Sequence, residues 1–430
     1  MDAEILIVSN GPGELASWVR PVVRALRETL PCRVTVALVP CPYASGHEAA
    51  TIAGWPEPVT VWAPETTLRY LLTGRAPAGF APLERGAVLF LGGDQLFAVL
   101  LSLRSGYPLL TYVEEAARWR AFTKRYLVNS RNTLLKLRHR RSNPNQLRLV
   151  GNLMVDAVQT RIDPIQARRV LGLRPDGLVL GLLPGSKPFK VHHMTPLFLR
   201  VAEILQRQDP TLQVVLHRSP FTPREQLVEA VENPRYRQIT GGAAGRLERE
   251  GTYDWLVSAG GARVLVVPPD LHYEGLAIAD LALTVPGTNT AELAVLGVPM
   301  LVALPLHKPE EIPLDGLVGR IGGIPLLGRW LKRALAHQVT RRKPLLALPN
   351  QRAGRLITPE LIGAFAPETL AEETGRLLAD AFERRDIKLR LHEAMGGSGA
   401  AAAVVEALRE VIAPSRSRQV PEDPAASQPQ

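Results

Sequence analysis

Three short segments of the sequence combine glycine with hydroxyl, amide and charged residues, a pattern typical of an anion-binding turn. They are Ser9–Glu14, Leu183–Lys187 and Val285–Leu293, and each follows an apolar run and precedes a helical pattern. Backbone N–H groups at such a turn point at a bound anion, and the dipole of the next helix favours its negative charge. The candidate binding residues are Asn10, Gly11, Gly13, Ser186, Lys187, Gly287, Thr288, Asn289, Thr290 and Glu292.

Each of these segments also has a purely structural interpretation. The first two can be tight turns between a strand and a helix, and the first lacks both the GxGxxG spacing and the ending of a P-loop. In the third, Thr288 or Asn289 can cap the next helix while Glu292 stabilises the helix dipole. The Glu292 carboxylate can equally accept hydrogen bonds from two ribose hydroxyls, so both interpretations can hold at once.

Two carboxylates in the first half of the chain are candidates for catalysis. Asp94 ends the turn Gly92-Gly93-Asp94 directly after an apolar run, where it can remove a proton from a hydroxyl group. It can equally be the N-cap of a helix that begins at Gln95. Glu14, at the end of the first glycine-rich segment, is the second candidate.

The loop Leu348–Arg355 brings an amide and a guanidinium, Asn350 and Arg355, to a position where they can bind a ligand or merely connect two elements. The histidines show no metal-ligand spacing, so we predict no metal site. The only cysteines, Cys32 and Cys41, exclude a disulfide scaffold and a zinc-ribbon array.

Short apolar strands that alternate with helical stretches must position these residues. The first series begins with a strand at 5–9 and a helix at 18–30, and a second series restarts at 178–183 after a linker near 152–175. Such a pattern predicts an α/β chain with two doubly wound parallel sheets. Ligands bind beyond the carboxyl ends of the strands in such folds, so we expect the site in a cleft between the two halves.

We expect four parts along the chain. Residues 1–160 form an N-terminal domain, and residues 161–395 form a C-terminal domain that holds the second and third candidate binding segments. Residues 396–413 form a helix that packs back on the first domain. Residues 414–430 form a disordered tail rich in Pro, Ser and Gln.

The composition is that of a folded protein with a basic surface. The chain has 430 residues, 46% hydrophobic, with 51 Lys and Arg against 41 Asp and Glu, a net charge of +10. It shows neither a signal peptide nor an apolar run long enough to cross a membrane. An acidic partner is therefore expected, such as an anionic lipid or a phosphorylated metabolite. Charge alone suggests nucleic acid, but no motif of that class is present, so none is predicted.

Two stretches contain many Lys and Arg and no Asp or Glu, at 117–141 and at 316–345. The region 314–345 also carries Trp330 and several Leu and Ile at near-helical spacing, which is typical of a helix lying on an anionic membrane. A solvated helix packed on the core is the alternative. For 117–141 a charged helix face is the commoner case, although it can be a second patch.

Taken together, the motifs resemble lipid-A-disaccharide synthases, which are inverting glycosyltransferases with the GT-B architecture. The segments Leu182–Lys187, Ala279–Leu293 and Leu348–Arg355, followed by Pro359–Leu361, are similar to that family's motifs. The similarity extends over most of residues 80–410. The predicted fold is therefore α/β and GT-B-like, with two Rossmann-like domains.

The resemblance implies transfer of an acylated glucosamine from a UDP-linked donor to a glycolipid acceptor, at the cytoplasmic face of the inner membrane. The UDP-sugar is a substrate, and no metal or other cofactor is implied. Arg224 lies where the family has a basic residue near the diphosphate, and Asp94 roughly matches the aspartate assigned to deprotonate the acceptor. By position, Asn350 and Arg355 line the same cleft. The resemblance also implies a homodimer that exchanges C-terminal segments.

The sequence departs from the family mainly in the first half. The opening segment Asn10–Glu14, the surroundings of Asp94 and the segment Glu114–Trp119 all differ from the family's patterns. We therefore expect a divergent relative that can use another glycolipid as acceptor. The resemblance assigns the acceptor to residues 1–160 and the UDP-sugar to residues 161–395. The alternatives are another UDP-sugar-dependent glycolipid glycosyltransferase, a UDP-sugar epimerase, or a non-catalytic protein that binds nucleotide sugars.

Overall fold

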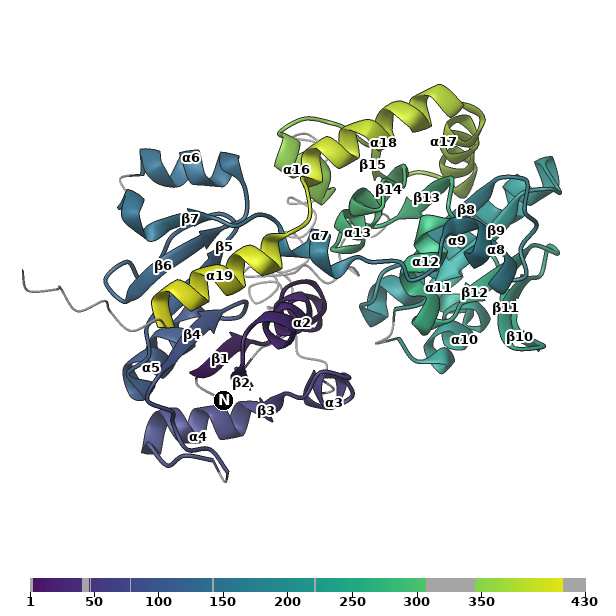
Figure 1. The fold of residues 1–430 in the computed structure, drawn as a ribbon. Coiled ribbons are helices and arrows are strands. Elements are labelled where there is room, and N and C mark those ends of the chain that lie inside the picture. The colour runs from purple at the N-terminus through teal and green to yellow at the C-terminus, as the bar shows by residue number, and fades with distance from the viewer. Residues whose placement is uncertain are drawn as a thin grey trace, which may run out of the picture. The chain divides into compact units, whose positions relative to one another are not determined.

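The computed structural model describes residues 3–40, 46, 48–77, 79–140, 143–219, 222–306 and 345–412. These residues form two compact units (Figure 1). Unit 1 takes Met1–Ala157 together with the segment from Ser398, and unit 2 takes Val158–Gly397. The predicted bounds, at 160/161 and 395/396, fall beside these divisions. The basic stretch 316–345, except Leu345, and the predicted tail 414–430 lie outside the described residues.

Unit 1 is built on a seven-stranded parallel sheet with the order β3-β2-β1-β4-β5-β6-β7. The chain adds strands on one side of β1 and then continues from β4 on the other side, so the order reverses between β1 and β4. Ile5 on β1 pairs with Val34 on β2 and with Ala87 on β4. The strands are β1 Ala3–Ser9, β2 Cys32–Leu38, β3 Thr60–Trp62, β4 Gly86–Phe90, β5 Leu109–Val113, β6 Thr123–Val128 and β7 Leu147–Leu149.

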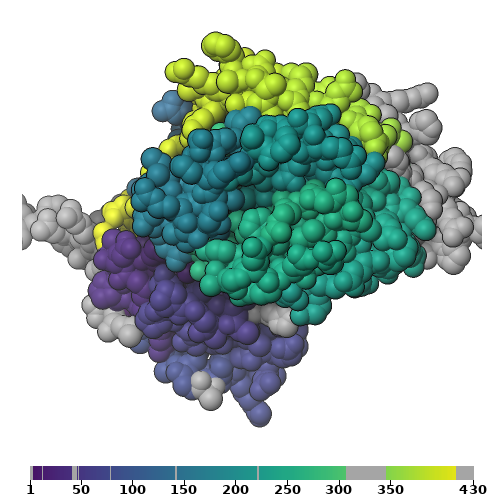
Figure 2. Space-filling model, turned by 90° about the vertical axis from the view of Figure 1, so that its right-hand side faces the viewer, coloured from purple at the N-terminus to yellow at the C-terminus, as the bar shows by residue number. Residues whose placement is uncertain are grey.

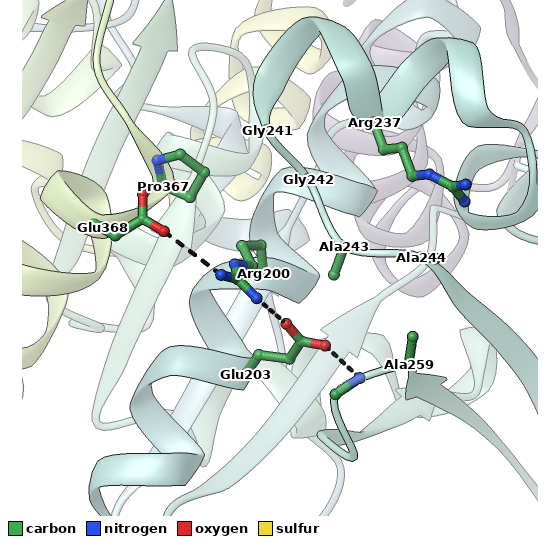
Figure 3. Close-up of a pocket in the computed structure, with 11 residues that line it drawn as sticks. Arg200, Glu203, Arg237, Gly241, Gly242, Ala243, Ala244, Ala259, Pro367 and Glu368 are labelled. Carbon is green, nitrogen blue, oxygen red and sulfur yellow. Dashed lines mark hydrogen bonds and ion pairs between the residues drawn. The ribbon is translucent and has the colours of Figure 1, made fainter.

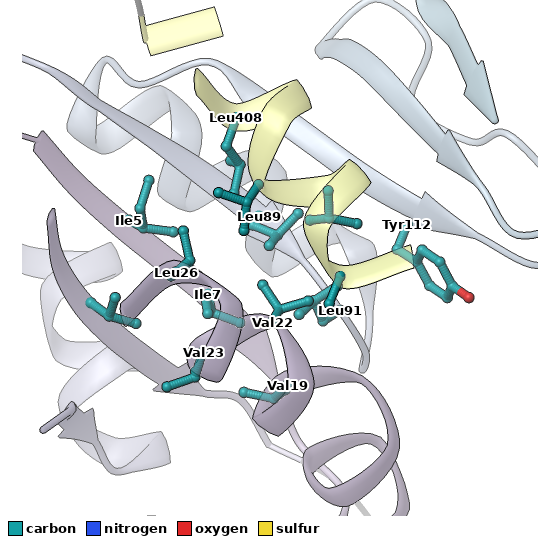
Figure 4. Packing of buried hydrophobic residues seen from close by; sticks show 14 of the residues in the cluster. Ile5, Ile7, Val19, Val22, Val23, Leu26, Leu89, Leu91, Tyr112 and Leu408 are labelled. Atoms are coloured by element: carbon teal, nitrogen blue, oxygen red, sulfur yellow. The ribbon is translucent and has the colours of Figure 1, made fainter. Parts of the chain in front are cut away.

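Alternation along β1 divides the core of unit 1 into two layers. Ile5 and Ile7 pack with helices α2 and α19 on one face, as Figure 4 shows, whereas Leu6 and Val8 pack with residues of α4 and α5 on the other. The helices of this unit are α1 Pro12–Glu14, a π-helix Leu15–Val19, α2 Arg20–Thr29, α3 Glu48–Ala53, α4 Pro64–Thr73, α5 Gln95–Ser105, α6 Arg131–His139, a 3₁₀ turn Pro144–Gln146, α7 Leu153–Ala157 and α19 Ala400–Ile412.

The C-terminal helix α19 is part of unit 1 although it follows the whole of unit 2 in the sequence. Its residue Leu408 lies in the same buried cluster as Ile5 and Leu89 (Figure 4). Asp156 fastens the start of α19, because its two carboxylate oxygens accept hydrogen bonds from the N–H groups of Gly399 and Ala401, at 2.7 and 2.6 Å. An aspartate far away in the sequence thus satisfies the first donors of this helix.

Unit 2 repeats the same winding and adds an antiparallel hairpin. The sheet order is β10-β11-β12-β9-β8-β13-β14-β15, and the order reverses between β8 and β13. Gly251, with φ of +59°, starts the two-residue turn between β10 and β11, where a positive φ favours glycine. The strands are β8 Val179–Leu183, β9 Gln213–His217, β10 Gly245–Glu250, β11 Tyr253–Ser258, β12 Arg263–Val267, β13 Leu281–Thr284, β14 Met300–Pro305 and β15 Glu360–Gly363.

The last helices of unit 2 pack against its first long helix. Helix α17 contacts α9, and in Figure 2 the yellow-green surface of the late segment borders the teal surface of residues near 200. The helices are α8 Pro164–Val170, α9 Pro188–Gln208, α10 Arg224–Glu232, α11 Pro234–Thr240, a 3₁₀ turn Pro269–Leu271, α12 His272–Ala277, α13 Asn289–Val295, α16 Leu348–Ala353, α17 Pro367–Ala379 and α18 Ala381–Met395.

The two doubly wound parallel sheets confirm the predicted α/β class. The sequence pattern missed the short strands β3 and β15 and the hairpin β10–β11, because these strands are short or partly exposed and carry little apolar signal. In the part of the chain that the structure describes, every helix is too short or too polar to cross a membrane.

Candidate functional site

Two loops of unit 2 are candidates for binding the sugar donor, and we call them the candidate donor loops. They lie where the order of the strands in the sheet reverses, between β8 and β13. The loop after β8 holds Ser186 and Lys187, and the loop after β13 holds Gly287 and Thr288. Because β8 and β13 are neighbouring parallel strands, their carboxyl ends bring the two loops together. In doubly wound folds this is the position at which ligands bind.

Specific contacts hold these two loops against each other. The Lys190 ammonium donates a hydrogen bond of 2.8 Å to the carbonyl oxygen of Pro286. Gly185 has a φ of +96°, and a Cβ there would lie 3.2 Å from Cγ2 of Val285. Glycine is therefore required both by the turn and by the close approach of the other loop. Ser186 is exposed beside this contact and Lys187 is half-buried.

The start of α13 is not capped as one of our interpretations predicted. Thr288 occupies the N-cap position and makes no side-chain capping hydrogen bond. The amide of Asn289 turns back to donate to the Thr284 hydroxyl. The buried Thr290 hydroxyl donates to the Gly287 carbonyl at 2.7 Å and accepts from the N–H of Leu348 at 3.1 Å. The side chains of the turn thus shape the loop. The N–H groups of Thr290, Ala291 and Glu292 donate to the Gly287 and Thr288 carbonyls, so among the described residues only the N–H groups of Thr288 and Asn289 are left for a ligand at the start of α13.

A pair of histidines lies next to Glu292, which the sequence pattern did not reveal. Nε2 of His272, at the start of α12, is 3.4 Å from Oε2 of Glu292 in the first turn of α13. The ring of His217, the last residue of β9, meets the His272 ring edge-on at 5.8 Å between centroids. Each histidine stands beside a strand end of the second series, which is the signal that could have pointed to them.

His217 is held in its neutral form. It is 4% exposed, and neither of its ring nitrogens has a hydrogen-bond partner among the described residues. Burial, and next the charge of His272, lower the pKa of His217 well below its ordinary value. Buried polar atoms are almost always paired, so two unpaired nitrogens beside the candidate donor loops are consistent with a ligand contact.

Arg224 does not contact these loops in the structure. It begins α10, and its guanidinium forms an ion pair with Asp254 on β11, at 3.2 Å between Nε and Oδ2. Two strands, β12 and β9, separate β11 from β8 in the sheet. The contact with a diphosphate that the resemblance implies for Arg224 stays a prediction.

Asn350 is buried, and its side chain holds its own loop together. Its side chain is fully buried, and its nitrogen donates to the Thr358 carbonyl at 2.9 Å and to Glu360 at 2.7 Å. Its oxygen accepts from the N–H groups of Ile357 and Thr358. The loop that Asn350 organises carries Arg355, which is exposed. Ligand contacts of Asn350 and Arg355 stay predictions, and in this conformation the Asn350 amide is already paired.

The candidate carboxylates of unit 1 lie where its sheet reverses, between β1 and β4. A Cβ on Gly92, with φ of +154°, would lie 2.8 Å from Cγ of Glu14 and 3.1 Å from the Ser9 hydroxyl. A Cβ on Gly93 would lie 3.0 Å from Nδ2 of Asn10. The two glycines therefore let the loop before Asp94 lie directly against the segment of Asn10 and Glu14.

The helix of this segment begins earlier than the sequence pattern predicted. It starts at Pro12, so Gly13 and Glu14 belong to its first turn and only Asn10 and Gly11 form the loop. It continues through a π-helix at Leu15–Val19 into α2. Short π-helical turns occur frequently at functional sites.

Asp94 is an exposed N-cap. Its Oδ1 accepts a hydrogen bond of 2.9 Å from the N–H of Leu96, at the start of α5. The capping interpretation therefore holds. Only one carboxylate oxygen makes that bond, which leaves the other oxygen to act on a hydroxyl group.

Several buried polar atoms near the carboxyl edge of the same sheet lack partners among the described residues. They belong to the side chains that follow β1, β6 and β7, and to the hydroxyl at the end of β1. Asn129 additionally donates to Glu114 at 3.4 Å. Unpaired buried polar atoms at a strand edge mark a place where a polar ligand can bind. The atoms are Ser9 Oγ, Asn10 Oδ1, Asn129 Oδ1 and Asn152 Nδ2.

A cavity of about 660 Å³ in unit 2 is lined by α9, by the segment 241–244 and by the start of α17 (Figure 3). Its lining contains two arginines and two glutamates, and three of these four pair with one another: Arg200 contacts Glu203 at 2.8 Å and Glu368 at 3.7 Å. Burial opposes ionisation of Glu203, but hydrogen bonds from Ser258, Arg200 and Gly260 hold its pKa below the usual value. We assign no function to this cavity because its charges balance one another.

No protein-family model matches the chain. Among curated proteins, it is similar to the lipid-A-disaccharide synthase of Pseudomonas aeruginosa, with 29% identity over 62% of this chain and 57% of that protein. It is 28% identical to the lipid-A-disaccharide synthase of Paraburkholderia phytofirmans over 55% of this chain and 49% of that protein. The chain thus spans about half the length of the curated relatives it matches. These similarities confirm the resemblance that the motifs indicated.

Solved structures confirm the two-domain GT-B-type fold. The UDP-GlcNAc 2-epimerase of Neisseria meningitidis, solved with UDP-GlcNAc, has a TM-score of 0.54 at 12% identity and covers 95% of this chain and 100% of its own. A putative UDP-N-acetylglucosamine 2-epimerase of Listeria monocytogenes has a TM-score of 0.52 at 14% identity, over 95% of this chain and 96% of its own. At such identities the likeness concerns the fold alone.

Proposed function

We propose that this protein is an inverting glycosyltransferase that transfers an acylated glucosamine from a UDP-linked donor to a membrane glycolipid, in the manner of lipid-A-disaccharide synthases. One observation carries the proposal: the loop with Ser186 and Lys187 contacts the loop with Gly287 and Thr288 where the strand order of unit 2 reverses. The similarity to lipid-A-disaccharide synthases supports the same assignment.

In this proposal unit 2 binds the donor. The N–H groups at the start of α13 and the Lys187 ammonium carry the charge that develops on the departing UDP. The Glu292 carboxylate accepts hydrogen bonds from the ribose hydroxyls. His272, whose Nε2 lies 3.4 Å from Oε2 of Glu292, holds that carboxylate in position. We propose that no metal ion and no cofactor besides the UDP-sugar takes part. In the described residues no group of three or more potential metal ligands occurs.

In this proposal unit 1 binds the acceptor. Asp94 removes the proton from the attacking hydroxyl, because one of its oxygens is free of the capping bond. Glu14 and the unpaired Asn10 oxygen, beside the Asp94 loop, hold the acceptor's polar head. The changed surroundings of Asp94 relative to the family support a divergent relative, for which another glycolipid is the alternative acceptor. A location at the cytoplasmic face of the inner membrane and a homodimer with exchanged C-terminal segments belong to the same proposal.

The test is mass spectrometry of the products from purified protein given UDP-diacylglucosamine and diacylglucosamine 1-phosphate in detergent. A tetra-acylated disaccharide phosphate would establish the synthase activity. A protein that binds UDP but makes no product would redirect the search to other glycolipid acceptors. Conversion of the UDP-sugar to its epimer without lipid would overturn the proposal in favour of an epimerase.

Binding of UDP separates the role of Glu292 from a general effect of lost charge. Glu292→Gln should weaken UDP binding about tenfold in calorimetry, because a carboxylate is a stronger acceptor for ribose hydroxyls than an amide. Glu225→Gln is the matched control, since Glu225 is an exposed acid in the first turn of α10. Equal affinities of the two variants would remove Glu292 from the site.

A further inference from the structure

Helix α5 presents an apolar face to solvent. Its inner face is buried through Ala98 and Leu101, while Leu96, Leu100 and Leu103 are 37, 41 and 63% exposed. Spacings of four and three residues place these three leucines on one side of the helix. A helix that is apolar on both faces is usually buried on both, and among the described residues nothing covers this outer face of α5.

Two exposed aromatic rings extend this apolar face. Trp119 and Phe122, 40 and 45% exposed, contact each other at 6.2 Å between ring centroids. Their loop is tied to the start of α5, because the Gln95 amide donates to the Arg118 carbonyl at 3.4 Å. Trp119 has a φ of +53°, the one positive φ of a non-glycine residue in the described part of the chain. The tertiary structure thus holds a tryptophan outward in an unfavourable backbone conformation.

Cations surround the apolar face. The guanidinium of Arg120 in the same loop donates to the Arg140 carbonyl at 3.4 Å, which joins the loop to the end of α6. The sequence from 117 to 141 contains no Asp or Glu that would neutralise these charges. The exposed cations of α5, the loop and α6 are Arg104, Arg118, Arg120, Arg131, Lys136, Arg138 and Arg140.

We propose that this face of unit 1 docks on an anionic lipid bilayer. We call it the α5 surface and define it by Leu96, Leu100, Leu103, Trp119 and Phe122. Leucine and aromatic side chains that enter the lipid interface, flanked by more cations than acids, are the chemistry of interfacial membrane binding. The exposed acids nearby are Asp94, Glu114 and Glu115, against the seven cations above. The sequence alone favoured a solvated helix face for this stretch.

The α5 surface begins at the residue that the proposed function makes the base. Asp94 caps α5, and Leu96, which donates to its carboxylate, is the first exposed leucine. A glycolipid in the docked bilayer would therefore present its head group at the start of α5. This consequence rests on the proposed function, whereas the docking itself does not.

Sedimentation with lipid vesicles tests the docking without any substrate. The full chain should sediment with vesicles of phosphatidylcholine and phosphatidylglycerol in equal parts, and much less with phosphatidylcholine alone. Leu100→Ser/Leu103→Ser should raise the lipid concentration for half-binding about tenfold or more, because two buried side chains leave the interface. Lys136→Gln/Arg138→Gln should weaken binding mainly at low salt.

The matched control is Phe382→Ser/Leu389→Ser on α18 of unit 2, whose side chains are 89 and 59% exposed. It should bind vesicles like the wild type, and thermal melting checks that every variant is folded. Unchanged vesicle binding of Leu100→Ser/Leu103→Ser would overturn the α5 surface. So would a loss of vesicle binding that occurs only in Arg329→Gln/Lys332→Gln/Arg333→Gln, which removes cations from the other basic stretch, 316–345. If the wild type does not bind vesicles but forms a dimer, and Leu100→Ser/Leu103→Ser dissociates that dimer, the docking proposal is overturned and the surface is an interface between two copies of the chain.

Failure of the proposed function would look different. A chain that binds vesicles through the α5 surface but converts the UDP-sugar to its epimer without lipid would overturn the proposed function and leave the docking surface standing.

Discussion

At the scale of single residues, the groups to which we assign chemistry also have structural tasks. Asp94 caps α5 with one oxygen and Thr290 joins the Gly287 carbonyl to Leu348. His217 fills a buried site with both ring nitrogens unpaired. A substitution at such a residue changes stability and function together, so each test needs a variant that keeps one of the two tasks.

Asp94→Asn is such a variant, because asparagine caps a helix about as well as aspartate but cannot accept a proton. We expect turnover to fall about a hundredfold or more while UDP affinity and melting temperature stay nearly unchanged. The matched control is Asp163→Asn, which alters the N-cap of α8. Equal turnover in both variants would exclude Asp94 as the base.

His217 predicts how stability depends on pH. Burial lowers its folded-state pKa well below 6.5, so the unfolded chain binds the proton more readily. Its stabilising contribution is complete above the unfolded pKa of about 6.5 and is lost as the pH falls below it, by at most about 1.4 kcal/mol per pH unit. Denaturant unfolding between neutral and mildly acidic pH should show a flatter dependence in His217→Leu. The exposed His139→Leu should keep the wild-type slope, and an unchanged slope in His217→Leu would contradict the assignment.

At the scale of elements, long-range hydrogen bonds decide where the C-terminal helix lies. Asp156 at α7 receives the N–H groups of Gly399 and Ala401, and the apolar side of α19 completes the core over β1 and β4. A local helical pattern predicts that α19 forms, but it is Asp156 and the exposed core of the sheet that hold it on unit 1.

Asp156→Ala should therefore destabilise unit 1 by about 1–3 kcal/mol, because the buried N–H of Ala401 and the partly buried N–H of Gly399 lose their acceptor. Chemical denaturation monitored by circular dichroism measures this loss. Glu406→Ala, on the exposed side of α19, removes an exposed ion pair with Arg409 and should cost less than about 1 kcal/mol. If both variants were equally stable, the capping by Asp156 would not hold α19.

At the scale of the whole molecule, unit 1 is built from the two ends of the chain and unit 2 from its middle. Unit 2 contains its own sheet, its own core and the candidate donor loops. Unit 1 depends on a helix that follows the whole of unit 2 in the sequence, so its core stays incomplete until unit 2 has been synthesised.

Removal of residues 398–430 should consequently destabilise unit 1 and spare unit 2. Six side chains of α19 leave the buried cluster: Ala400, Ala401, Val404, Val405, Ala407 and Leu408. We expect hydrogen exchange to show lost protection in β1, β4 and α2, with protection of β8 and β13 and binding of UDP retained. Removal of 413–430 is the control and should leave both units protected. Retained protection of β1 after the larger truncation would contradict this account.

The sequence by itself determined the class of the fold and the places where ligands could bind. Continuous apolar runs specify buried parallel strands, and glycine-rich turns at their ends are local features that need no knowledge of distant residues. The segments at Ser186–Lys187 and Gly287–Glu292 and the turn at Asp94 were therefore found, and all of them lie at the strand ends where the sheets reverse.

Only the tertiary structure decided which of these ends become neighbours. The contact of the His217 ring with the His272 ring, the approach of His272 to Glu292 and the return of α19 join residues that are far apart in the sequence. The sequence of α5 is apolar all round, so only the packing of the folded chain showed which face is buried and which is exposed. Local patterns encode periodicity and turns, whereas strand order and the choice of a buried face follow from packing of the whole chain.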